Sequence, residues 1–197
     1  MSKALTDLDN DAKLYEAFEQ AGNVVLPVYF DTWSKGRDEQ APDFVTRHAF
    51  KRVRGVNREL ALSSLIPVHK LKPLLPFFAE VASGIGHLNL FPDRDGCVRH
   101  QANLVHYQQD TFFPSFPLTI VRLYMGLKLE DIAVVLGEGI SLRAGPTSVV
   151  RVPVVNPQMM TLISWSKGPD VAFHQTPFTK VYRNRFQTSL LDRKSVV

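Results

Sequence analysis

The feature that most constrains the fold of this chain is the stretch GIGHLNLFPDRDGCVR at residues 84–99. Its centre, FPDRDG, is typical of a tight turn, because glycine adopts positive φ and aspartate hydrogen-bonds to its own backbone. The segments on either side, GHLNLF and CVRHQANLVHYQ, have the composition of β-strands. The sequence therefore predicts a hairpin at residues 86–108, with Asp93, Asp95 and Gly96 at its corner.

A metal loop is one alternative for this corner. A calcium loop of the EF-hand type supplies oxygen ligands at fixed positions along the chain. If the loop began at Asp93, Asp95 would fit, but Cys97 and Leu104 would occupy two later ligand positions. Neither side chain offers a hard oxygen, so we expect no metal here.

A catalytic acid pair is the other alternative. Asp93 and Asp95 are too close in sequence to flank a substrate alone, but with His87 they would make an acid/base set for a small soluble enzyme. Arg99 follows the turn and can pair with either aspartate. We favour a structural corner built from Asp93, Asp95, Gly96 and Arg99.

Helical segments precede and follow this region. Residues 9–22 form an amphipathic pattern that Asp9 or Asn10 can cap and Gly22 can end. A second helix is predicted at 73–83. A third is predicted at 114–126 and begins with a Ser115 cap.

The third helix carries apolar residues at helical spacing, which predicts a buried face. That face consists of Ile120, Leu123, Tyr124 and Leu127.

Strand-like segments occupy much of the remaining chain. They lie at residues 24–30, 139–145, 148–154 and 159–165. Pro27 in the first of them cannot donate to a ladder, which indicates an edge strand or a bulge.

Two regions are less regular. Residues 31–72 are expected to be a long excursion with some ordered pieces. A helical or loop segment is expected at 176–186, and the final LLDRKSVV resembles the start of a strand.

The element order predicts an α/β or α+β domain over residues 1–197, with a single central mixed sheet flanked by helices.

The composition is that of an ordinary globular domain. The 197 residues are 45% hydrophobic and 21% charged with a net charge of +4, which suits one globular domain and demands no polyanionic partner. The single cysteine, Cys97, excludes an internal disulfide and a cysteine-based zinc site. No apolar run approaches the roughly 20 residues that cross a bilayer.

The histidines do not form a metal-binding pattern. His100 and His106 lie on one face of the predicted strand but too far apart to share an ion alone. His87 on the neighbouring segment could join one of them. We expect structural histidines instead.

A basic stretch offers a third functional hypothesis, a nucleic-acid interface. Phosphate binding uses clustered cations with aromatic rings between them. The residues concerned are Arg47, Lys51, Arg52, Arg54 and Arg58, with Phe44 and Phe50 interleaved. We favour a solvated face and expect no nucleic-acid partner.

Common enzyme motifs are missing from the sequence. GIGHLN lacks the last glycine of a dinucleotide fingerprint, and there is no phosphate loop, no G-x-S-x-G elbow and no H-E-x-x-H pair. These absences do not exclude an enzyme, but they remove the recognisable kinds, so we expect no cofactor and assign no catalytic residue.

The ordered segments together resemble the second type of CHASE domain, a sensory extracellular module of bacterial receptors. DNDAKLYEAFEQAGNVVLPVYF is similar to that family's opening helix and strand. GHLNLFPDRDGCVRHQANLVHY resembles its Asp-x-Asp-Gly-x-x-Arg hairpin, and PSFPLTIVRLYMGL resembles the helix that follows. VRVPVVNPQMMTLISW and LLDRKSVV are similar to its later strands.

The resemblance implies an extracytoplasmic sensor in a bacterial inner-membrane receptor. Such a domain is tethered by membrane segments outside this chain, detects a small-molecule or protein stimulus, and feeds an adenylate or guanylate cyclase or a histidine kinase. It also implies a homodimer, no catalytic residues, and a chain that ends before the family's last strands. The resemblance leaves the ligand-binding residues open.

Overall fold

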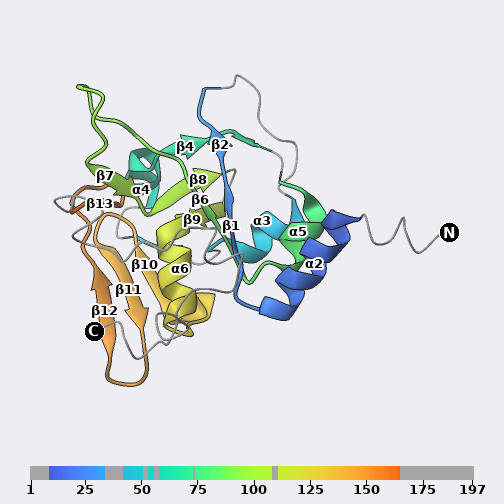
Figure 1. The fold of residues 1–197 in the computed structure, drawn as a ribbon. Helices are drawn as coiled ribbons and strands as arrows, with labels where there is room; N and C mark the ends of the chain where they lie inside the picture. Colours follow the sequence, from blue (N-terminus) through green and yellow to red (C-terminus); the bar gives the residue numbers. More distant parts are fainter. Residues whose placement is uncertain are drawn as a thin grey trace. The chain divides into compact units, whose positions relative to one another are not determined.

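A computed structural model describes residues 9–33, 42–50, 53–55, 58–72, 74–107 and 111–164. The described residues up to Ile163 form one compact unit (Figure 1). The predictions for residues 176–186 and for the final LLDRKSVV lie outside the described residues. No helix in the described ranges is long and apolar enough to cross a membrane.

The helices, in chain order, are α2 Asn10–Ala21, α3 Asp43–His48, α4 Arg58–Ser64, α5 Pro76–Val81, α6 Phe116–Tyr124 and the short 3₁₀ helix η1 Leu129–Asp131. The strands are β1 Val25–Val28, β2 Phe30–Asp31, β3 Val53–Arg54, β4 Pro67–Val68, β5 Lys70–Leu71, β6 Gly84–His87, β7 His100–Ala102, β8 Leu104–Tyr107, β9 Thr111–Pro114, β10 Ile132–Val135, β11 Gly139–Arg143, β12 Val149–Val152 and β13 Met160–Leu162. The predicted mixed α/β class is therefore confirmed.

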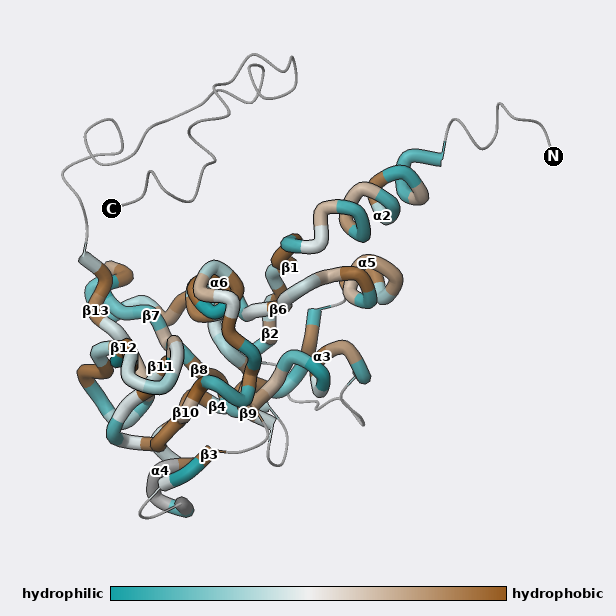
Figure 2. The backbone as a smooth tube through the Cα atoms, turned by 90° about the horizontal axis from the view of Figure 1, so that it is seen from below, coloured by the Kyte–Doolittle hydropathy of each residue, from teal (hydrophilic) through white to brown (hydrophobic). Residues whose placement is uncertain are grey.

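Helix α2 begins and ends as its sequence predicts. The Asp9 carboxylate accepts a hydrogen bond from the Ala12 backbone N–H at 3.0 Å, and Gly22 ends the helix at φ 61°. Its aromatic side packs on α5, where the rings of Phe18 and Phe78 lie 5.4 Å apart (Figures 1 and 2). A small interface of this kind attaches the helix without burying any of its residues.

The predicted single central sheet is replaced by five small sheets among the described residues. Their strand orders are β1-β6, β12-β11-β10-β3, β13-β7, β2-β5 and β4-β8-β9. One reason lies in β1, where Pro27 has no N–H for a further ladder. Among the described strands, β1 pairs with β6 alone, in parallel. Pro27 therefore marks an edge strand, as predicted.

Asn103 gives the second reason, because the chain changes partner there. Its backbone N–H donates to the Met159 carbonyl at 3.1 Å, while its own carbonyl accepts from the Ser115 N–H at 2.8 Å. β7, before it, pairs with β13, and β8, after it, pairs with β9 and β4. A single residue thus passes the chain from one sheet to another.

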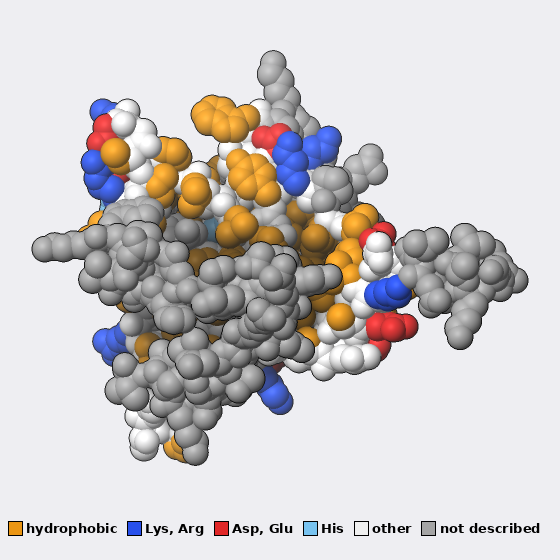
Figure 3. Space-filling model, viewed as in Figure 1, with side chains coloured by type: hydrophobic (Ala, Val, Ile, Leu, Met, Phe, Trp, Pro, Cys, Tyr) orange, Lys and Arg blue, Asp and Glu red, His pale blue; other side chains and the backbone are white. Residues whose placement is uncertain are grey.

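The hairpin predicted at residues 86–108 does not form as a ladder. The corner itself is closed, because the Asp93 N–H donates to the Cys97 carbonyl at 2.8 Å. The strands on either side nevertheless pair elsewhere, β6 with β1 and β7 with β13. The corner stands at the tip of an exposed excursion, where Figure 3 shows acidic and basic side chains together.

The four-stranded sheet supplies much of the core. Ile132 and Val134 of β10 and Ile140 and Leu142 of β11 alternate with more exposed residues, so one face of the ladder is buried. Figure 2 shows β10 as a strongly hydrophobic strand. The buried residues form two hydrophobic clusters, one that includes Ile85 and another that includes these four residues.

Helix α6 is capped as predicted but turns a different side inward. The Ser115 hydroxyl accepts from the Leu118 N–H at 3.3 Å. The helix buries Leu118, Thr119 and Arg122, whereas Ile120 and Tyr124 are 43% and 52% exposed. The predicted apolar face is therefore wrong for those two residues, because β6 packs against the side that carries Thr119 and Arg122.

Candidate functional site

The corner residues are held together by Arg99. Its Nη1 lies 3.0 Å from Asp93 Oδ2 and 2.9 Å from Asp95 Oδ1, and its Nη2 donates to Asp95 Oδ2 at 2.7 Å. The Cys97 N–H also donates to Asp95, and Gly96 takes φ 80° to close the turn. These bonds lower the pKa of Asp95, with Arg99 as the largest cause, and raise the pKa of Arg99.

The acid/base set of Asp93, Asp95 and His87 is not brought together. The side chains of Asp93 and Asp95 are 34% and 53% exposed at the corner, while His87 has no exposed surface within β6. In the parts of the chain that the structure describes, no three metal-ligating side chains cluster either. The catalytic alternative therefore gains no geometric support.

Removing the Arg99 side-chain charge should release the corner carboxylates without unfolding the domain. In an Arg99→Gln variant we expect the pKa of Asp95 to rise toward its ordinary value, because the guanidinium is the main cause of its lowering. Carboxyl ¹³C shifts followed by NMR over a pH titration would measure this change. An unchanged Asp95 titration would contradict the pairing seen in the structure.

The stability of the same variant should change little, because exposed ion pairs contribute little to folding. The control is Arg94→Gln, which alters a neighbouring arginine at the same turn. A large fall in melting temperature confined to Arg99→Gln would show that the corner does more than shape a loop.

The basic stretch does not present aromatic rings to solvent. Phe44 and Phe50 are 9% and 4% exposed and belong to the hydrophobic core. They are not available as stacking platforms for bases. The side chains of Lys51, Arg52 and Arg58 lie outside the described residues.

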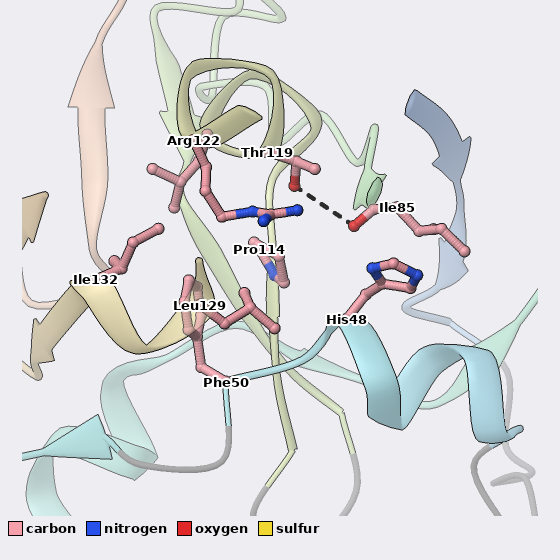
Figure 4. Close-up of a pocket in the computed structure, with 9 residues that line it drawn as sticks. His48, Phe50, Ile85, Pro114, Thr119, Arg122, Leu129 and Ile132 are labelled. Carbon is pink, nitrogen blue, oxygen red and sulfur yellow. Dashed lines mark hydrogen bonds between the residues drawn. The ribbon is translucent and has the colours of Figure 1, made fainter. Parts of the chain in front are cut away.

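A pocket between α3 and α6 is a second candidate site (Figure 4). The pocket is partly open to solvent, and in this conformation its side chains leave no room between them for a water molecule. Its walls are mostly apolar, with three polar side chains among them. The lining residues are His48, Phe50, Ile85, Pro114, Leu118, Thr119, Arg122, Leu129 and Ile132.

Arg122 is the charged group of this pocket. It is 9% exposed, and its guanidinium donates to the carbonyls of Leu127 at 3.1 Å and Ser83 at 3.3 Å. It forms no ion pair with a carboxylate of the described residues. Burial lowers the pKa of Arg122, and the charge of Glu130 acts in the opposite direction.

His48 is the second polar group. It ends α3, and its Nε2 atom is buried without a hydrogen-bond partner among the described residues. Burial lowers its pKa to about 4, with further contributions from the charges of Arg122 and Arg47. His48 is therefore neutral at neutral pH.

Thr119 completes the polar set and links the pocket to β6. Its hydroxyl lies 3.0 Å from the Ser115 carbonyl and 3.4 Å from the Ile85 carbonyl, the second contact being drawn in Figure 4. Ile85 belongs to one core cluster, whereas Phe50 and Ile132 belong to the other. The pocket therefore lies where the two clusters meet.

The sequence interpretation missed this site. It treated the third helix as an ordinary amphipathic element and weighed His87, His100 and His106 but not His48. One signal was present, since Arg122 is the only charged residue between Thr111 and Leu127. A lone cation within an apolar run is costly to bury unless it has a function or a partner.

Taken together, fold and pocket define a mixed α/β domain with a buried cationic pocket and no assembled catalytic set among the described residues. Comparison with known families gives the more particular answer. The model of the CHASE2 domain matches residues 2–197. The chain therefore belongs to the CHASE2 domain family, which comprises extracellular sensory domains of cyclase and kinase receptors. No curated protein and no solved structure matched the chain.

Proposed function

We propose that this chain is the extracytoplasmic sensory domain of a bacterial transmembrane receptor. Its output would be an adenylate or guanylate cyclase, a histidine kinase or a similar enzyme, and the domain itself would not be catalytic. The observation that carries the proposal is the CHASE2 match over residues 2–197, because the family has a sensory role. Membrane segments outside this chain would tether it to the inner membrane.

The position of the pocket supports a sensory mechanism. A stimulus shifts a receptor only if it interacts better with one of two conformations. A ligand between Ile85 and Phe50 would contact both core clusters and favour the packing that accommodates it. The change would then pass through α6 and β6 to the flanking membrane segments, in a receptor that we expect to act as a homodimer.

The location can be tested with reporter fusions in the parent receptor. Alkaline phosphatase inserted after residue 197 should be active, because that enzyme folds only outside the cytoplasm, where disulfides form. Green fluorescent protein at the same position, exported through the general secretory pathway, should be dark. A matched pair of fusions to the output region should give the reverse pattern.

The opposite result, an inactive phosphatase and bright fluorescence after residue 197, would overturn the proposal. The domain would then lie in the cytoplasm, and a stimulus from outside the cell could not reach it directly.

A further inference from the structure

The pocket between α3 and α6 holds a buried positive charge, Arg122, that forms no direct ion pair with a described carboxylate, although the charge of Glu130 acts on it from outside the pocket lining. A guanidinium has five N–H donors, and a carboxylate can accept two of them side by side. Two bonds from Arg122 go to backbone carbonyls, which carry no net charge. Burying such a cation costs free energy unless an anion compensates it.

A second group in the same pocket also lacks a partner. His48 Nε2 is buried and makes no hydrogen bond to the described residues. Figure 4 shows the imidazole and the guanidinium converging on one space from α3 and α6. Since His48 is neutral at neutral pH, its Nε2–H tautomer can donate to an anion that Arg122 attracts.

We propose that this pocket binds a small organic carboxylate, with its carboxylate on Arg122 and His48 and its hydrocarbon part against the apolar walls. The inference rests on the proposed function, because it names the class of stimulus that the sensory domain would detect. It assigns a recognition role to two side chains, Arg122 and His48.

The walls decide between classes of anion. Phe50, Leu118 and Ile132 are apolar and deeply buried, so they favour a ligand with a hydrocarbon part. A phosphate dianion would need a second cation or several more donors to replace its water. Thr119 cannot supply one easily, because its hydroxyl already has the carbonyls of Ser115 and Ile85 within reach.

The size of the pocket limits the ligand. In this conformation the space between the lining side chains does not admit a water molecule, so the pocket is closed to a ligand. Any ligand would therefore have to part the two core clusters to enter. A carboxylate with a few carbon atoms fits this requirement, and a displacement of this kind is what a sensor needs.

The test is a titration of the full 197-residue chain, labelled with ¹⁵N, with butyrate as the probe. Neutral butyramide has a similar shape, and inorganic phosphate is an anion without a hydrocarbon part. We expect butyrate to shift the NMR signals of Thr119 and Arg122, with butyramide and phosphate binding roughly tenfold or more weakly.

Variants separate the two recognition groups. Arg122→Lys keeps the charge but loses the forked geometry, so we expect roughly tenfold weaker butyrate binding. His48→Gln should weaken binding less, because a neutral hydrogen bond contributes less than a charged one. The control is Arg143→Gln, at an exposed position on β11, which should bind butyrate like the parent chain.

Several outcomes would overturn the inference. They are the absence of butyrate shifts in this pocket, equal binding of butyramide, tighter binding of phosphate, and unchanged binding by Arg122→Lys. The reporter fusions test the location of the domain, and their result does not depend on butyrate binding. If the domain lies outside the cytoplasm but does not bind butyrate, the proposed function stands and the carboxylate site is wrong. If it lies in the cytoplasm and binds butyrate, the carboxylate site stands and the proposed function is wrong.

Discussion

A Gly86→Ala variant is expected to lose about 3 kcal/mol of folding free energy, at the upper end of the cost of overpacking a core. A Cβ atom built on Gly86 would lie 2.6 Å from Phe116 Cα, 2.7 Å from Phe116 N and 2.8 Å from the Ser115 carbonyl carbon. All three are backbone atoms at the start of α6. They cannot move away without disturbing the Ser115 cap or the pairing of β6 with β1.

Two other glycines provide a graded comparison. At Gly84 the new Cβ would meet Thr119 Cγ2 at 2.6 Å and Leu123 Cδ1 at 2.9 Å, which are side-chain atoms and can partly rotate away. We therefore expect a smaller loss for Gly84→Ala. At Gly139, in β11, no atom lies within 4 Å, so Gly139→Ala should be neutral or slightly stabilising.

Urea unfolding of the three variants would measure these differences. A Gly86→Ala variant as stable as Gly139→Ala would show that α6 does not approach β6 as closely as the structure has it. The same contact explains the GIG sequence, which fails as a dinucleotide fingerprint. Its glycines let a helix lie directly on a strand.

Local features of this fold could be predicted from sequence, and partnerships between distant segments could not. The caps at Asp9 and Ser115 and the stop at Gly22 depend on a few adjacent residues, and all three are confirmed. The pairing of β6 with β1 depends on the shape of the whole core. A strand-like composition does not say which neighbour the strand will have.

The candidate site was hidden for a related reason. Arg122 and His48 are far apart in sequence, and neither belongs to a recognisable motif. Only the packing of α3 and α6 on β6 brings them to one pocket. The Asp93 and Arg99 pairing, by contrast, is contained within one turn, and the sequence predicted it.

A second large effect is expected from pH, through His87. This side chain has no exposed surface, and neither ring nitrogen has a hydrogen-bond partner among the described residues. Burial lowers its pKa from 6.5 to about 3. Between these values the unfolded chain binds a proton that the folded chain does not, so stability falls as the pH falls.

The loss through His87 should reach about 2 kcal/mol at about pH 5, relative to about pH 8. His48, with its pKa lowered to about 4, acts in the same direction over much of this range. Below a pH of about 3 His87 is protonated in both states, and its contribution to the slope ends. Acid should therefore destabilise the domain mainly between pH values of about 6.5 and 3.

A His87→Leu variant isolates this contribution, because leucine fills a similar volume and cannot bind a proton. At about pH 8 we expect it to be as stable as the parent chain or more so, since an unpaired buried polar group is removed. At about pH 5 it should keep the roughly 2 kcal/mol of folding free energy that the parent chain loses between about pH 8 and about pH 5. Urea unfolding at the two pH values separates two effects of the substitution. A change in packing alters the free energy of unfolding equally at both pH values, whereas a change in proton binding alters the difference between the two free energies. The double variant His48→Gln/His87→Leu should flatten the profile further. The contradicting outcome is a His87→Leu variant that loses as much stability as the parent between the two pH values. The imidazole would then have to be hydrogen-bonded or hydrated in the folded domain, and water would have to reach β6.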